Sequence, residues 1–166
     1  KGGAIYSTND ISVSGNTFSG NTADDLNNNY YSETANFDTF ETLLENGGSI
    51  SLSKDYVSGS SSDVDVYKSV TIYGNGYTLD AANENSRFFK IHSGTVTVYN
   101  LNFENYDSGV YDGAILIDEG ASLVLVNCTF NNNHADNGGA IYNEGGSLTV
   151  ANSTFTLNRA DKKGGA

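Results

Sequence analysis

The sequence predicts an all-β protein that folds as a parallel β-helix, a solenoid with about 25–27 residues per coil and one short helical cap. Similar segments recur at that spacing, and within each segment apolar and polar residues alternate as in a half-buried strand. Glycine and asparagine interrupt the strands where the chain must turn. Short strands separated by turns fit a solenoid, in which each coil pairs its backbone with the next. The clearest repeats are residues 2–24, 113–136 and 138–161, each running from Gly-Ala-Ile to Ala-Asp in outline.

Aromatic residues mark one position in successive repeats. Phe155 follows Phe130 by 25 residues, Phe130 follows Phe103 by 27, and Phe103 follows Tyr77 by 26. We expect these rings to stack as a column inside the coils. Phe103 is not followed by asparagine three residues later, so the pattern is expected to break or shift in its coil.

Asparagine recurs at two positions of the repeat. An inward asparagine can donate a hydrogen bond to one coil and accept one from another, and it tolerates a left-handed turn. We therefore expect two internal ladders, with solvent-exposed loop asparagines as the alternative. The first ladder comprises Asn100, Asn127 and Asn152, and the second comprises Asn21, Asn133 and Asn158.

Composition excludes several classes of function and partner. The chain has 166 residues, 20 acidic and 8 basic side chains, and a net charge of −12, which opposes nucleic acid and anionic membrane partners. No apolar run approaches the length of a membrane span. The chain begins at Lys1 without a signal peptide, so we expect a mature fragment or a piece of a longer protein. The single cysteine, Cys128, allows no internal disulfide.

Two motifs carry a resemblance to known repeat proteins. The Gly-Gly-Ala-Ile and Phe-x-x-Asn motifs resemble repeats of the polymorphic outer membrane protein type. The stretch from Ser69 to Asp80, followed by Ser86 to Asn105, is similar to adhesin-like surface proteins of methanogenic archaea. The resemblance implies a right-handed parallel β-helix displayed outside the cell and used in attachment, with no catalytic residues to carry over. The motifs stand at Gly2–Ile5, Gly138–Ile141, Phe18–Asn21, Phe130–Asn133 and Phe155–Asn158.

Residues 37–46 interrupt the β pattern. Phe37, Phe40, Leu43 and Leu44 recur at helical spacing, and Asn36 can cap the N-terminus of a helix. We expect this helix to cover the open first coil of the solenoid, with a partner-binding amphipathic helix as the alternative.

The expected organisation has four parts. Residues 1–25 form an isolated coil, 26–36 a linker, 37–46 the capping helix and 47–166 the β-helix. The first coil is read as the end of a preceding module or as an exchanged coil.

The two ends of the chain share a sequence. Lys1–Ala4 recurs as Lys163–Ala166, and the isolated coil at 1–25 precedes the cap. We therefore expect either a tandem array or copies that associate head to tail into a filament. The residues expected at that contact are Gly2, Gly3, Ile5, Val13, Phe18, Ile141, Leu148 and Val150.

Enzymatic and metal chemistry are not expected. The carboxylates form no obvious catalytic pair and there are only two arginines, although a carbohydrate-binding or polysaccharide-degrading β-helix is kept as the alternative. His92 and His134 lack acidic or cysteine ligands at metal spacing. Asp24, Asp136 and Asp161 could hold structural calcium, but solvated turn aspartates are favoured and no cofactor is expected.

Surface features suggest partners. Tyr6, Leu116 and Tyr142 are expected to form an outward column that could bind host or neighbouring-cell carbohydrate, or simply belong to an outer sheet. Asn127 and Asn152 each begin an Asn-x-Thr glycosylation sequence, but the internal ladder is favoured, because a buried asparagine cannot carry a glycan. We expect an extracellular, cell-surface protein whose partners are copies of itself, with host or neighbouring-cell carbohydrate as a further candidate.

Overall fold

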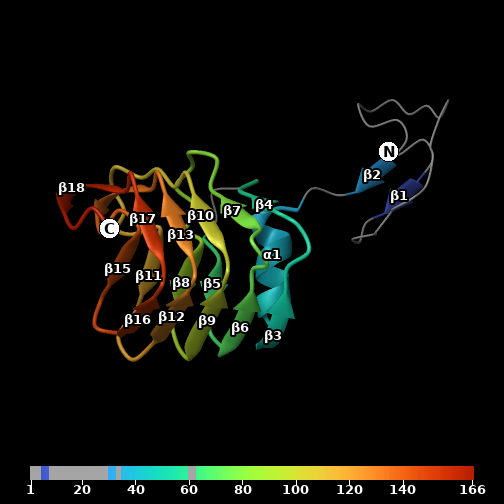
Figure 1. Cartoon of the computed structure of the whole chain (residues 1–166), viewed down its shortest axis with the longest axis horizontal. Coiled ribbons are helices and arrows are strands. Elements are labelled where there is room, and N and C mark those ends of the chain that lie inside the picture. Colours follow the sequence, from blue (N-terminus) through green and yellow to red (C-terminus); the bar gives the residue numbers. More distant parts are fainter. Residues whose placement is uncertain (1–4, 8–29, 33–34, 60–62) are drawn as a thin grey trace. The chain divides into compact units, whose positions relative to one another are not determined.

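The computed structural model describes residues 5–7, 30–32, 35–59 and 63–166. Residues 1–34 and 35–166 form two separate units. The larger unit is a parallel β-solenoid with a single short helix, α1, at the end opposite its last coil (Figure 1). The predicted fold class is therefore confirmed.

Three parallel sheets run along the solenoid, and a fourth sheet of two strands joins them near the C-terminus. Sheet I contains β3 (Gly48–Ser51), β6 (Val70–Tyr73), β9 (Thr95–Tyr99), β12 (Ser122–Val126) and β16 (Ser147–Ala151). Sheet II contains β4 (Tyr56–Val57), β7 (Thr78–Asp80), β10 (Asn102–Glu104), β13 (Thr129–Asn131) and β17 (Thr154–Thr156). Sheet III contains β5 (Asp65–Val66), β8 (Phe89–Ile91), β11 (Ile115–Ile117) and β15 (Ile141–Asn143), and sheet IV contains β14 (His134–Asn137) and β18 (Arg159–Lys163). Along the chain the strands enter sheet I, then sheet II, then sheet III in each coil up to β11. The next coil adds β14 of sheet IV between sheets II and III, and the last coil ends in sheet IV.

Parallel register places equivalent residues opposite one another. Val98 on β9 lies opposite Leu125 on β12, which lies opposite Val150 on β16. Because side chains alternate between the two faces of a strand, the apolar residues of each coil point inward together. Val96, Val98 and Leu125 are fully buried, so the core is a continuous stack of such rows.

An aromatic column runs through sheet II. The rings of Phe103 and Phe130 stack with centroids 4.5 Å apart, and those of Phe130 and Phe155 with centroids 4.8 Å apart. The expected continuation through Tyr77 is wrong, because Phe103 pairs with Leu79. The residue opposite Phe103 therefore comes two positions later in the chain than the spacing of the aromatic residues predicts.

Helix α1 (Phe37–Leu44) is two residues shorter than the predicted 37–46. Its N-terminus is capped as expected, since Asn36 accepts from the Thr39 N–H at 2.9 Å and Thr39 Oγ1 accepts from the Asn36 N–H at 3.0 Å. Phe40 packs on Tyr56 and Phe89 with ring centroids 5.2 and 5.9 Å apart. The helix therefore buries its apolar face against Tyr56 of the first coil and Phe89 of the second.

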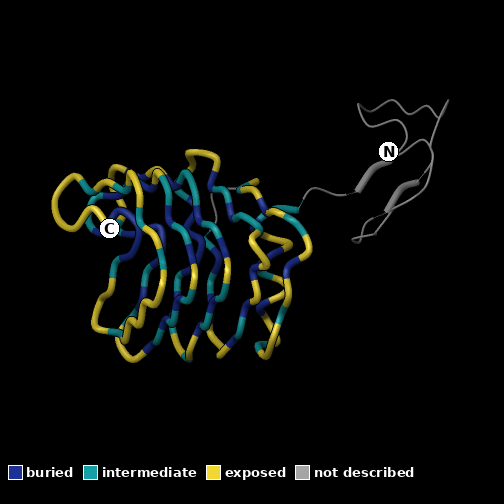
Figure 2. The backbone as a smooth tube through the Cα atoms, viewed as in Figure 1, coloured by how far each residue is buried: buried dark blue, intermediate teal, exposed yellow. Residues whose placement is uncertain are grey.

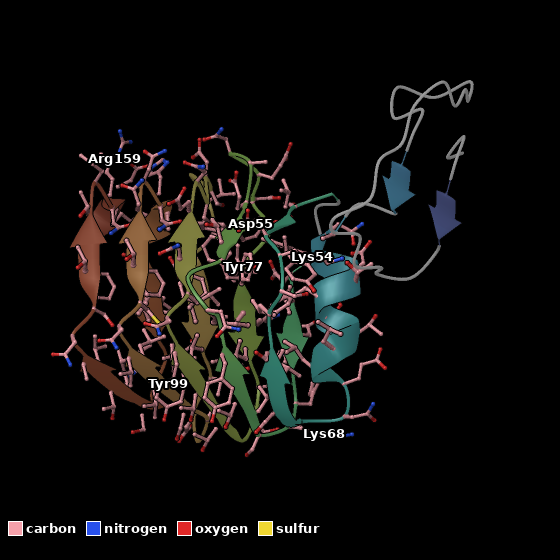
Figure 3. The ribbon with its side chains drawn as sticks, turned by 45° about the vertical axis from the view of Figure 1, so that its right-hand side comes forward. Lys54, Asp55, Lys68, Tyr77, Tyr99 and Arg159 are labelled. Atoms are coloured by element: carbon pink, nitrogen blue, oxygen red, sulfur yellow. The ribbon has the colours of Figure 1, made fainter. Side chains whose placement is uncertain are left out.

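Polar contacts fasten the helix to the strands beside it. A carboxylate oxygen of Glu41 accepts from the Asp65 N–H at 2.8 Å. Lys68, labelled at the lower end of α1 in Figure 3, donates to the Glu45 carbonyl at 2.8 Å.

The smaller unit contains one strand pair in its described part. β1 (Ile5–Ser7) pairs in parallel with β2 (Tyr30–Ser32), with Ile5 opposite Tyr30. The expected linker at 26–36 therefore contains a strand. The remainder of the expected first coil, residues 1–4 and 8–25, lies outside the described residues.

We expect Phe130→Ala to lower the free energy of unfolding by about 3–5 kcal/mol, the usual cost of emptying a buried aromatic site. Urea denaturation followed by circular dichroism measures this loss. Phe155→Ala is the matched control and should cost less, because Phe155 is only partly buried. A loss below about 1 kcal/mol for Phe130→Ala would contradict the internal column.

Candidate functional site: the terminal coil and the outward rows

The terminal coil exposes side chains that earlier coils bury. Leu148 and Val150 on β16 are 38% and 43% exposed, whereas their partners Leu123 and Leu125 on β12 are fully buried. The difference arises because β16 is the last strand of sheet I and has a neighbour on one side only. Figure 2 shows exposed residues along this end of the solenoid and buried rows within it. Among the other residues predicted at a contact between copies, Ile141 is buried, and Gly2, Gly3, Val13 and Phe18 lie outside the described residues.

The last residues of the chain already lie on the edge of this coil. The Gly138 N–H donates to the Lys163 carbonyl at 2.7 Å, and the Gly139 N–H donates to the Gly164 carbonyl at 3.0 Å. A Cβ atom at Gly139 would lie 2.3 Å from the Arg159 carbonyl oxygen, so only glycine fits. The Gly-Gly-Ala-Ile motif is therefore the place where neighbouring backbones approach most closely.

The second predicted asparagine ladder lies inside the solenoid. Asn133 is fully buried and donates to the Phe103 carbonyl at 3.2 Å and to Asn158 Oδ1 at 2.9 Å. Asn158 donates to the Phe130 carbonyl at 3.0 Å. The ladder ends at Tyr106, whose N–H donates to Asn133 Oδ1 at 3.1 Å, and Asn21 lies outside the described residues.

The first predicted ladder is not internal, and this expectation is wrong. Asn100, Asn127 and Asn152 are all exposed. Their φ angles are 51°, 54° and 51°, so the left-handed turn that was expected is present. In this turn the side chain leaves the corner of the coil toward solvent. The argument against glycosylation, which rested on burial, therefore fails.

Both histidines lie between aspartates of other coils, contrary to the sequence-based expectation that they have no acidic neighbours. His92 Nδ1 lies 2.8 Å from Asp118 and Nε2 lies 2.8 Å from Asp65. His134 Nδ1 lies 2.7 Å from Asp107, and its Nε2 lies 3.1 Å from Asp161. The sequence spacing hid these contacts, because each pair is about one coil apart. Among the described residues, no cluster of three or more histidine, cysteine, aspartate or glutamate side chains is suited to a metal ion.

The hydrogen bond that His134 donates to the Asp107 carboxylate raises the pKa of His134 above its ordinary value, and Asp161 acts in the same direction. A protonated imidazole would link three coils through its hydrogen bond to Asp107 and its electrostatic contact with Asp161. These contacts between coils should therefore depend on pH through the protonation of His134.

The aspartates considered for calcium are paired with cations. Lys162 lies 2.6 Å from Asp136, and Arg159, labelled at the end of the solenoid in Figure 3, pairs with Asp161. Asp24 lies outside the described residues. Asp136 and Asp161 therefore each have a basic side chain as a partner.

Two residues of the predicted outward column, Leu116 and Tyr142, lie next to each other in sheet III. Leu116 lies opposite Tyr142, and Lys90 lies opposite Leu116 on the other side. Leu116 and Tyr142 are both partly exposed, and nothing is described of the Tyr6 side chain. A lysine within the row makes it less uniform than the sequence suggested.

Sheet I carries an outward surface that the sequence reading missed. Its five strands contain no charged residue, in a chain of net charge −12. Tyr73 and Tyr99 stack on its outer face with ring centroids 5.4 Å apart and planes 12° apart, and Thr71 and Thr97 pair alongside them. Figure 3 shows Tyr99 beside the strands of this sheet. The two tyrosines are 26 residues apart, one coil period, and this spacing could have predicted that they stack.

Cys128 is buried, and burial raises the pKa of its thiol. A thiol of raised pKa is a poor nucleophile at neutral pH. The residue therefore contributes to packing.

Comparison with known proteins gives one match. A family model described as the Chlamydia polymorphic membrane protein repeat matches residues 127–144, from the exposed turn before β13 to the end of β15. No curated protein and no solved structure matches the chain significantly. The short match and the parallel solenoid together fit a repeat protein of this surface-displayed, adhesin-like type. Within the described residues, no helix is both long and apolar enough to cross a membrane.

We expect the stability that His134 confers to depend on pH. Because its folded-state pKa is raised above the unfolded value of about 6.5, its contribution is complete below that pH and is lost as the pH rises through the folded pKa. Urea midpoints of the wild type and His134→Gln, measured from pH 5.5 to 8.5, should differ most at the acidic end. Asp107→Asn should flatten this difference, and a difference that grows with pH would contradict the assignment.

Proposed function

We propose that this protein is a surface-displayed, adhesin-like solenoid whose terminal coil accepts a further coil from a second copy. The observation that carries the proposal is the exposure of Leu148 and Val150, whose equivalents on β6, β9 and β12 are all buried. An uncovered terminal coil also presents unpaired backbone donors and acceptors, which solenoids normally cover. A coil of matching sequence would bury both.

Residues 5–24 have the sequence that such a coil needs. Ile5-Tyr6 corresponds to Ile141-Tyr142, Val13 to Val150 and Phe18 to Phe155. Stacked in the register of the other coils, Val13 would cover Val150 and Phe18 would extend the aromatic column. Lys163–Ala166 already occupies the place of the copy's Lys1–Ala4, so pairing between copies would begin at Ile5.

The asparagine ladder would fix the register of the contact between copies through a side-chain hydrogen bond. Each inner asparagine donates to the carbonyl of the phenylalanine one coil back, as Asn158 does to Phe130. By the same geometry, Asn21 of a second copy would donate to the Phe155 carbonyl. A shift of one residue would turn that amide outward and bury unpaired polar groups.

Such a contact joins different surfaces of two copies and does not close. Repetition would produce a filament or, in a longer chain of tandem modules, a continuous stalk. The proposal assigns no catalytic activity to the chain.

We expect Val150→Asp to abolish association at concentrations where the wild type forms larger species, because it places a charge in the row to be buried. Thr149→Asp is the matched control, since Thr149 is on the same strand but faces outward. Sedimentation velocity over a concentration series measures the distribution. Removing residues 1–25 should also leave a monomer with unchanged β content. A wild type that remains monomeric at high concentration, or a truncated chain that still assembles, would refute the head-to-tail contact.

A second function is favoured by the outer face of sheet I. Stacked Tyr73 and Tyr99 offer flat aromatic surfaces to sugar rings, and Thr71 and Thr97 add hydroxyl groups. An uncharged face on an acidic protein suits a neutral polysaccharide, which the net charge does not repel.

We expect the double variant Tyr73→Ser, Tyr99→Ser to lose retardation in native gels that contain a neutral polysaccharide. Tyr142→Ser, on sheet III, is the control and should be retarded like the wild type. If Tyr142→Ser alone abolishes retardation, the outward column of sheet III is the binding face instead. New reducing ends released from the polysaccharide would identify an enzyme.

A further inference from the structure

Two asparagines occupy one exposed corner on adjacent coils. Asn127 follows β12 and Asn152 follows β16, and the Asn127 N–H donates to the Ala151 carbonyl at 3.0 Å. Both residues adopt the left-handed conformation and both are exposed. Within the described part of the chain, neither side-chain amide makes a hydrogen bond.

The threonines two residues later face the same way. Thr129 begins β13 and Thr154 begins β17, and each precedes an inward phenylalanine, so alternation directs both hydroxyl groups outward. Thr129 is half-buried and Thr154 is exposed. The sequences Asn-Cys-Thr and Asn-Ser-Thr therefore present an unbonded amide and an outward hydroxyl together, as an N-glycan acceptor requires.

We propose that Asn127 and Asn152 are acceptor sites for N-linked glycans. In the transfer, the amide Nδ2 bonds to C1 of an oligosaccharide carried on a polyprenyl phosphate or pyrophosphate. The C1–O bond to the carrier breaks, the amide loses a proton, and the polyprenyl carrier leaves with both electrons of that bond. The reaction requires an exported chain, as the proposed surface function does.

The location leaves the fold undisturbed. Asn133 and Asn158 are used inside the solenoid, where a glycan would destroy the ladder, but neither begins an Asn-x-Ser/Thr sequence. Asn127 and Asn152 contribute only their backbones to the turn. A glycan on either would project from the corner between sheets I and II.

The chain contains a natural control at the same corner. Asn100 has a φ of 51° and is exposed, but the residue two places later is Asn102, whose amide donates to the Gly76 carbonyl at 2.9 Å. The turn is therefore common to three coils, and the threonine distinguishes two of them.

The test is the intact mass of the full chain, secreted from a eukaryotic host that glycosylates Asn-x-Ser/Thr, before and after peptide N-glycosidase. Thr129→Val and Thr154→Val keep the β-branched shape of the strand and remove the hydroxyl. We expect each single variant to lose the glycan of its own asparagine and the double variant to carry none. An unmodified wild type, or a glycan that persists in the double variant, would overturn the proposal.

A gain of modification tests the geometry. Adding Asn102→Thr to the double variant creates an acceptor sequence at Asn100 and should restore one glycan. A protein left unmodified by that change would refute the role of the turn.

The midpoint of thermal unfolding gives a second test of whether the glycans lie on the outside of the fold. Enzymatic removal of the glycans should leave it unchanged, and a shift as large as that of Phe130→Ala would contradict an outward site. Sedimentation of the same variants separates the two proposals, since a chain that assembles but carries no glycan would overturn this one alone.

Discussion

Parallel backbone pairing between successive coils is the interaction on which the rest of the structure depends. The Thr129 N–H donates to the Leu101 carbonyl at 3.0 Å, and the Thr154 N–H donates to the Cys128 carbonyl at 2.8 Å. Each coil thus supplies hydrogen-bond donors to backbone carbonyl groups of the coil before it. Parallel register places like residues on like residues. Stacked phenylalanines and the asparagine ladder are consequences of that register, and so is the exposure of equivalent residues wherever the stack ends.

The same register can bring like charges on neighbouring coils close together. Like charges placed directly opposite each other repel, and the chain has 20 acidic side chains against 8 basic ones. The scarce cations and the histidines lie beside carboxylates of neighbouring coils. Arg87 lies 2.7 Å from Asp63, and His92 lies between Asp65 and Asp118. These cross-coil pairs offset part of the repulsion between carboxylates on neighbouring coils.

The two ends of the solenoid differ in how their apolar rows meet the solvent. At one end, α1 packs Phe40 on Tyr56 and covers the first coil. At the other, β16 leaves Leu148 and Val150 exposed. An eight-residue helix is too short to be stable alone, so it depends on the coil that it covers as much as the coil depends on it. This asymmetry gives the solenoid a direction, with one covered and one open end.

The sequence by itself determined the coil period, the stacking of Phe130 on Phe155, the inner asparagines Asn133 and Asn158, and the capping helix. These depend on local alternation and on spacing, which are visible along a single chain. The tertiary structure alone decided which face each turn residue takes and which side chains of different coils meet. Asn127 and Asn133 are both repeated asparagines, yet the left-handed corner directs one outward and the strand geometry directs the other inward. His92 meets its aspartates only because coils of unequal length come into register, and Leu79 replaces Tyr77 for the same reason. A side chain's environment in a solenoid is set by the coil beside it, and the sequence spacing does not specify that contact to within one residue.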